Sequence, residues 1–124
     1  MPITSKIDLE NDLTIFTAEE NPSFEEFMAA VKLFYDGDPT RNVLWNFREG
    51  SGWELTGEHL KRLSQYASRI DKSRPGAKTA MVASDELSKS LSNLFMLFGQ
   101  SEKLKIKMKI FKTETEALAW IKTD

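Results

Sequence analysis

The sequence of 124 residues contains no cysteine and only one histidine, His59. Without cysteine, the chain cannot form disulfides, thiolate metal sites or a cysteine nucleophile, and this composition suits a reducing cytoplasm. A single histidine also excludes a multi-histidine metal site within the chain. We therefore expect a cytoplasmic protein with no metal and no cofactor.

The sequence also lacks a large excess of charge of either sign and long apolar runs. The formal net charge is −2, whereas neutralising nucleic-acid phosphates requires a basic excess. No segment approaches the roughly 20 apolar residues of a membrane-spanning helix, and the first residues lack the apolar stretch of a signal peptide. We expect no nucleic-acid partner and no integral membrane segment. The 40% hydrophobic and 29% charged residues are typical of a globular protein, which we expect to form a single domain over residues 1–124.

Hydrophobic periodicity predicts five strands. Alternating residues predict an antiparallel hairpin over residues 2–9 and 12–18. Almost continuous apolar runs over residues 43–47 and 77–83 are typical of central strands that are covered on both faces. A strictly alternating run over residues 104–110 carries lysines on one side, which favours a strand at a sheet edge.

Helical spacing and capping residues separate these strands. Ser23 and Glu26 form a capping box that opens the first predicted helix, which ends at Gly37. Thr56 is the expected N-cap of the second helix, over about residues 57–71. Each of these helices carries apolar residues on one face, so each is expected to pack on the sheet.

Two further helices complete the pattern. The third is expected to begin after Ser84 or Asp85 and to end at Gly99, and Thr113 with Glu116 forms a capping box that opens the fourth. The resulting order is ββαβαβαβα. Crossovers between parallel strands are right-handed almost without exception. We therefore expect an α/β fold with a mixed β-sheet of about five strands, the hairpin at one end and amphipathic helices packed on it.

This order of elements resembles the STAS domain, the fold of bacterial anti-anti-sigma factors, and more narrowly the small bacterial SpoIIAA-like (STAS/SEC14-type) proteins. The matching segments are residues 3–9 and 13–16, Phe24-Glu-Glu-Phe27, Val43-Leu-Trp-Asn-Phe-Arg48, Leu55-Thr-Gly-Glu-His-Leu60, and residues 75–83 and 111–121. The resemblance implies a non-enzymatic regulatory domain that binds a protein partner. A role in binding a hydrophobic ligand would resemble the lipid-carrying branch of the wider grouping.

In anti-anti-sigma proteins, the corresponding helix opens with an Asp-Ser-Ser/Thr-Gly-Leu pattern, and a partner kinase phosphorylates its hydroxyl residue. When the two patterns are aligned on Gly57, Thr56 matches the phosphorylated position, whereas Glu54 and Leu55 replace the aspartate and the preceding hydroxyl residue. Thr56 therefore has two interpretations, which are compatible. It is a helix cap, or a phospho-acceptor whose phosphate would meet the positive end of a helix dipole.

The polar loop before this helix is a candidate contact region for a protein partner. This predicted partner-contact loop consists of Arg48, Ser51, Trp53, Glu54, Gly57 and Glu58. An exposed tryptophan is a common interface anchor, although Trp53 could also fold over the edge of the domain.

The third predicted helix carries more apolar surface than one sheet face needs. Its contiguous apolar run is Leu94, Phe95, Met96, Leu97 and Phe98. Three interpretations remain open: a homodimer surface, plain core, or the wall of a pocket for a hydrophobic ligand.

The sequence contains no recognisable catalytic constellation, so no catalytic residue is assigned. His59 shares a helical stripe with Leu63, Tyr66 and Ile70, which favours a partly buried structural role. Two functions remain. The first is a protein-interaction module controlled by phosphorylation at Thr56, and the alternative is a carrier or sensor of a lipid or other hydrophobic small molecule.

Overall fold

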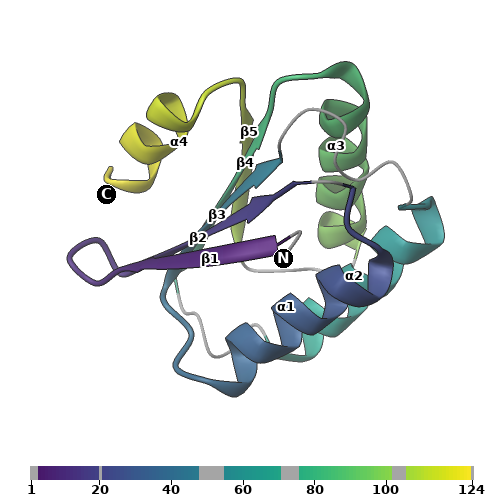
Figure 1. Cartoon of the computed structure of the whole chain (residues 1–124), viewed down its shortest axis with the longest axis horizontal. Coiled ribbons are helices and arrows are strands. Elements are labelled where there is room, and N and C mark those ends of the chain that lie inside the picture. Colours follow the sequence, from purple (N-terminus) through teal and green to yellow (C-terminus); the bar gives the residue numbers. More distant parts are fainter. Residues whose placement is uncertain (1–2, 20, 48–54, 71–75, 102–105, 124) are drawn as a thin grey trace.

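The structure is a computed structural model that describes residues 3–19, 21–47, 55–70, 76–101 and 106–123; the side chains of residues 68–70, 87–88, 91 and 98–101 lie outside this description (Figure 1). The strands are β1 (Ile3–Asp8), β2 (Leu13–Ala18), β3 (Asn42–Phe47), β4 (Lys78–Ala83) and β5 (Lys107–Phe111). The helices are α1 (Phe24–Asp36), α2 (Gly57–Ile70), α3 (Glu86–Ser101) and α4 (Glu114–Ile121).

The strands form one mixed sheet in the order β1-β2-β3-β4-β5. β1 pairs with β2 in antiparallel fashion, and the remaining neighbours are parallel. The predicted α/β fold, with the hairpin at one end of the sheet and the lysine-bearing β5 at the other, is confirmed. The parallel strands are added in one direction, and right-handed crossovers then bring α1, α2 and α3 to the same face of the sheet. Figure 1 shows α4 by itself on the opposite face.

The hairpin turn between β1 and β2 is stabilised by polar side chains. Asp12 adopts a left-handed φ of 50°, a conformation that Asp tolerates better than most residues. The side-chain amide of Asn11 donates to the carboxylate of Asp8 at 2.7 Å. This hydrogen bond favours the charged carboxylate and lowers the pKa of Asp8 below its ordinary value.

The face of the sheet that α4 covers has its own apolar core. Its buried members are Leu13, Leu44, Ala80, Val82, Ala117 and Ile121. At the edge of this core, the buried Lys78 donates from Nζ to the backbone oxygen of Trp120 at 3.0 Å and to Oγ1 of Thr123 at 2.8 Å. A lysine is favourable here because its ammonium group satisfies carbonyl groups at the C-terminal end of α4.

The opposite face carries the larger aromatic core, beneath α1, α2 and α3. The ring of Trp45 stacks on Phe16 at a centroid distance of 4.4 Å and on Phe47 at 5.8 Å. Phe27 of α1 lies against both Trp45 and Phe47. These aromatic side chains hold α1 on the sheet.

Two predictions at helix ends require correction. α3 does not stop at Gly99 but continues to Ser101, because a glycine inside a helix costs only about 1 kcal/mol relative to alanine. At the start of α4, the hydroxyl of Thr113 accepts the N–H of Glu116 as expected, but it also donates to the Glu116 carboxylate at 3.0 Å. Of the two capping boxes predicted with a glutamate, the one at Ser23 and Glu26 is fully reciprocal.

Candidate functional site

The start of α2 contains Thr56, which is exposed and caps the helix as predicted. Its Oγ1 accepts the N–H of His59 at 3.1 Å, and Nδ1 of His59 accepts the N–H of Thr56 at 3.2 Å. This arrangement is a capping box in which histidine takes the place that Glu or Gln usually holds. Accepting a hydrogen bond at Nδ1 places the hydrogen of the neutral ring on Nε2.

His59 also connects the start of α2 to α1. Its half-buried ring lies parallel to that of Phe24, with centroids 4.4 Å apart and planes inclined by 9°. The predicted structural role of His59 is therefore confirmed. The side chain of His59 both completes the cap of α2 and packs on α1. It therefore fixes the position of Thr56 at the protein surface.

The charged groups described near Thr56 are exposed side chains in the first two turns of α2. The carboxylate of Glu58 lies 3.9 Å from Nε of Arg62, one turn further along α2, and both side chains are largely exposed. Surface pairs of this kind contribute little to stability. A phosphate on Thr56 would be attracted by the helix dipole and repelled by Glu58.

Gly57 follows Thr56 and packs against α3. A Cβ at this position would lie 3.7 Å from Cδ2 of Leu94, which is an ordinary van der Waals contact. The backbone of Gly57 is not in the left-handed region, so an alanine would be tolerated here. The glycine matches the motif of the resembled family without being required by local packing.

The structure describes only part of the predicted partner-contact loop. Arg48, Ser51, Trp53 and Glu54 lie outside the described residues, so their roles stay predictions. Gly57 and Glu58 belong to the first turn of α2, directly after Thr56.

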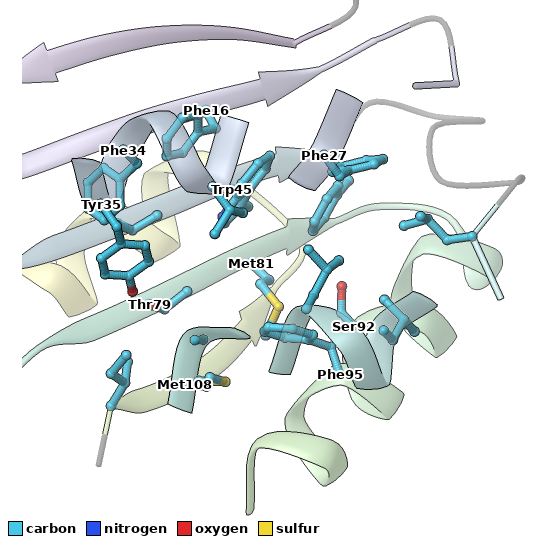
Figure 2. A pocket seen from close by; sticks show the side chains of 18 residues that line it. Phe16, Phe27, Phe34, Tyr35, Trp45, Thr79, Met81, Ser92, Phe95 and Met108 are labelled. Carbon is cyan, nitrogen blue, oxygen red and sulfur yellow. The ribbon is translucent and has the colours of Figure 1, made fainter. Parts of the chain in front are cut away.

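An apolar cavity of about 100 Å³ lies between the sheet and helices α1, α2 and α3 (Figure 2). Among the described residues that line it, none carries a formal charge. Aromatic and aliphatic side chains dominate the lining, and the exceptions with polar atoms at the tip are Tyr35, Thr79 and Ser92. Of the residues of α3, the lining contains Ser92 and Phe95.

The apolar run of α3 is divided between several environments. Phe95 faces the cavity, Leu94 packs near Gly57, Met96 is half-buried and Leu97 is 60% exposed. The side chain of Phe98 lies outside the description. Among the described side chains of this run, Phe95 lines the cavity, and the choice between dimer surface, core and ligand pocket stays a prediction.

Sequence reasoning did not identify Ser92 as part of this site. Ser92 is only 3% exposed, and its hydroxyl has no hydrogen-bond partner. Figure 2 shows its oxygen pointing from α3 toward the sheet. The feature of the sequence that could have identified it is a serine three residues before Phe95, on a helix face that is otherwise apolar.

Within the described ranges, no group of three or more histidine, aspartate and glutamate side chains is placed to hold a metal ion. None of the helices in that part of the chain combines the length and the hydropathy that a membrane crossing needs.

A mixed sheet in this strand order, with a hydroxyl-capped helix after its first central strand, defines a domain of the STAS type. The family model described as SpoIIAA-like matches residues 13–122, and the chain belongs to this family. Domains of this kind are generally regulatory rather than enzymatic, and they typically interact with proteins. No curated protein matches the chain. No solved structure matches it either.

Proposed function

We propose that the chain is a cytoplasmic, non-enzymatic regulatory module that binds a protein partner through the start of α2. The contact surface consists of Thr56, Gly57 and Glu58, and the preceding residues Arg48, Ser51, Trp53 and Glu54 extend it. One observation carries the proposal: Thr56 is exposed at a capped helix start, where proteins of the resembled family carry their phospho-acceptor.

Phosphorylation of Thr56 is the proposed control of this surface. A phosphate adds a charge of about −1.5 to −2 at neutral pH, next to the exposed Glu58. Its oxygens would accept hydrogen bonds from the amides of the first turn, where Oγ1 now accepts the N–H of His59. The helix therefore tolerates the modification, whereas a partner surface that fits the neutral hydroxyl meets a strong new negative charge. Phosphorylation would weaken that complex.

The outer side of α3 is a proposed homodimer surface. Leu97 is 60% exposed at the end of this helix, and the half-buried Met96 lies next to it. Sedimentation of the wild type and of Leu97→Glu tests this proposal, since a charge in the interface would shift a dimer toward the monomer. A wild type that sediments as a monomer at high concentration would contradict it.

Binding of a hydrophobic small molecule is the second candidate function. The apolar cavity beneath α1, α2 and α3 favours it, because a concave, mostly apolar surface with few polar groups is typical of small-molecule sites. This candidate is compatible with the first, since a ligand in the cavity and a partner on the α2 start would occupy different places.

The principal experiment locates the contact surface. The chain is used to capture its partner from the native host, and amide hydrogen exchange of the purified complex is compared with that of the free chain. We expect slower exchange in the first turn of α2. The first turn of α4, which begins after the exposed cap Thr113, serves as the internal control and should not change. Protection at α4 without protection at α2 would overturn the proposal.

A further inference from the structure

We propose that the groove between β1 and α1 binds an extended, positively charged segment of a partner protein, which pairs with β1 as an added strand of the sheet. This contact goes beyond the proposed function, because neither Thr56, Gly57 nor Glu58 lines the groove. Three properties of the described residues carry the inference: an open edge of the sheet, an apolar groove beside that edge, and carboxylates in the lining of the groove.

The open edge is β1. It is the outermost strand, and among the described residues no strand pairs with its outer side (Figure 1). Its residues 4–7 are exposed, and its register with β2 continues along the whole strand without a bulge. The opposite edge strand, β5, exposes Lys107 and Lys109, and lysines discourage strand pairing, whereas β1 carries the single lysine Lys6. Of the two edges, β1 is therefore better suited to accept a further strand.

An open groove of about 440 Å³ lies between β1 and α1. The rings of Phe16 and Phe34, packed edge to face with centroids 5.8 Å apart, belong to its lining. Two large apolar side chains of the lining are exposed: Ile7 of β1 is 60% exposed, and Leu33 of α1 is 77% exposed. Apolar side chains that gather around a surface groove indicate an interaction site.

The geometry of the edge determines the pattern of the bound segment. Side chains alternate between the two faces of a strand, so every second side chain of an added strand would point into the groove, toward Ile7 and Leu33. These positions favour apolar residues. The remaining side chains would lie beside the exposed Thr4 and Lys6 of β1, where polar residues are favoured.

The charge of the groove favours a basic segment. Glu26, near the start of α1, and Asp38, just after its end, belong to the lining, and both are exposed. The described lining contains no lysine or arginine. Lysine or arginine residues on either side of the apolar positions would therefore be attracted to the two ends of the groove.

The same charges disfavour a second copy of this chain as the occupant. Ile3, the first residue of β1, packs against the core cluster that contains Phe27, so β1 and α1 begin at the same end of the groove. If two β1 strands paired in antiparallel fashion, the end with Glu26 in one copy would meet the end with Asp38 in the other. Carboxylates would then face carboxylates, which is unfavourable.

The test uses two synthetic peptides with neutral, blocked ends, Lys-Thr-Val-Thr-Val-Thr-Lys and Glu-Thr-Val-Thr-Val-Thr-Glu. Each is titrated into the full chain, and NMR follows amide chemical shifts and amide hydrogen exchange. We expect the lysine peptide to bind, to shift the amides of β1 and to slow the exchange of every second one, with β5 unchanged as the internal control. The glutamate peptide should bind about fivefold more weakly or less, because its charges have the wrong sign.

Two pairs of variants locate the contact. Leu33→Ser should weaken binding of the lysine peptide about three- to tenfold, because an apolar contact is lost. Leu97→Ser is its control, since Leu97 is also an exposed helical leucine but lies outside the groove. Asp38→Asn should weaken the same peptide about two- to fivefold, whereas Glu86→Gln, at an exposed acid of α3 outside the groove, should not. Thermal unfolding establishes that all four variants fold.

The possible results separate this inference from the proposed function. If the lysine peptide does not bind at millimolar concentration, or binds without protecting β1, the added strand is wrong. Equal effects of Leu33→Ser and Leu97→Ser would place the peptide elsewhere and overturn the inference as well. If the amides of β1 become protected in the free chain as its concentration rises, the occupant is a second copy and the basic partner is wrong. Each of these results leaves the proposed contact at the start of α2 untouched.

Discussion

The imidazole of His59 lies flat on the ring of Phe24, and the same imidazole accepts the N–H of Thr56. The packing of α1 against α2 and the cap of α2 therefore depend on one side chain. Because Thr56 is the residue through which we propose that partner binding is controlled, the contact between Phe24 and His59 sets the geometry of the regulatory surface.

The two roles of His59 can be separated by substitution. His59→Gln retains an acceptor of the kind found in common capping boxes but loses the stacked ring, which should cost about 0.5–1.5 kcal/mol of unfolding free energy. His59→Ala loses the acceptor as well and should cost about 1 kcal/mol more. Urea unfolding measures both values. Equal stabilities of the two variants would show that the hydrogen bond to Thr56 contributes nothing.

Lys78 provides a second prediction, on the other face of the sheet. Lys78→Met keeps most of the aliphatic stem but removes the hydrogen bonds from the ammonium group to Trp120 and Thr123. Hydrogen bonds to a charged group contribute about 1.5–3 kcal/mol, so the free energy of unfolding should fall by roughly that amount and amide exchange in α4 should accelerate. Lys109→Met is the control, since Lys109 is exposed on β5 and its loss should change stability by less than about 0.5 kcal/mol. Similar effects of the two substitutions would contradict the capping role of Lys78.

The pH dependence of stability should reveal the hydrogen bond between Asn11 and Asp8. Because this bond lowers the pKa of Asp8 in the folded protein below the ordinary value of 3.8, its contribution is fully present above that value. The contribution is lost as the pH falls through the lowered pKa of the folded state. Asn11→Ala should bring the pKa of Asp8 back toward 3.8, as measured by NMR titration of the carboxyl carbon. An unchanged titration curve would show that another group holds the carboxylate.

Local signals in the sequence predicted most of the elements. The capping box of Ser23 and Glu26, the cap at Thr56 and the antiparallel pairing of the hairpin depend on neighbouring residues, and the structure confirms all three. The prediction that α3 ends at Gly99 was wrong. The helix continues to Ser101, since a glycine disfavours a helical conformation only weakly.

Contacts between distant parts of the chain could not be predicted in this way. His59 does not fit the usual capping-box pattern, and its stacking partner Phe24 lies in another helix. In the sequence, nothing explains why Lys78 interrupts an apolar strand. The structure explains it, because the C-terminal end of α4 lies beside Lys78 and accepts its hydrogen bond. The cavity and its polar residue Ser92 depend on side chains from three helices and the sheet, so only the three-dimensional arrangement reveals them.

The measurement that tests the central claim most directly is the affinity of the captured partner for three forms of the chain: wild type, Thr56→Glu and Thr113→Glu. The two threonines are both exposed helix caps, so the two substitutions place the same charge at equivalent positions of α2 and α4. If the start of α2 is the regulated contact surface, calorimetry will show binding to Thr56→Glu weakened by about tenfold or more, with Thr113→Glu close to wild type. Equal affinity of the partner for all three forms would contradict the account.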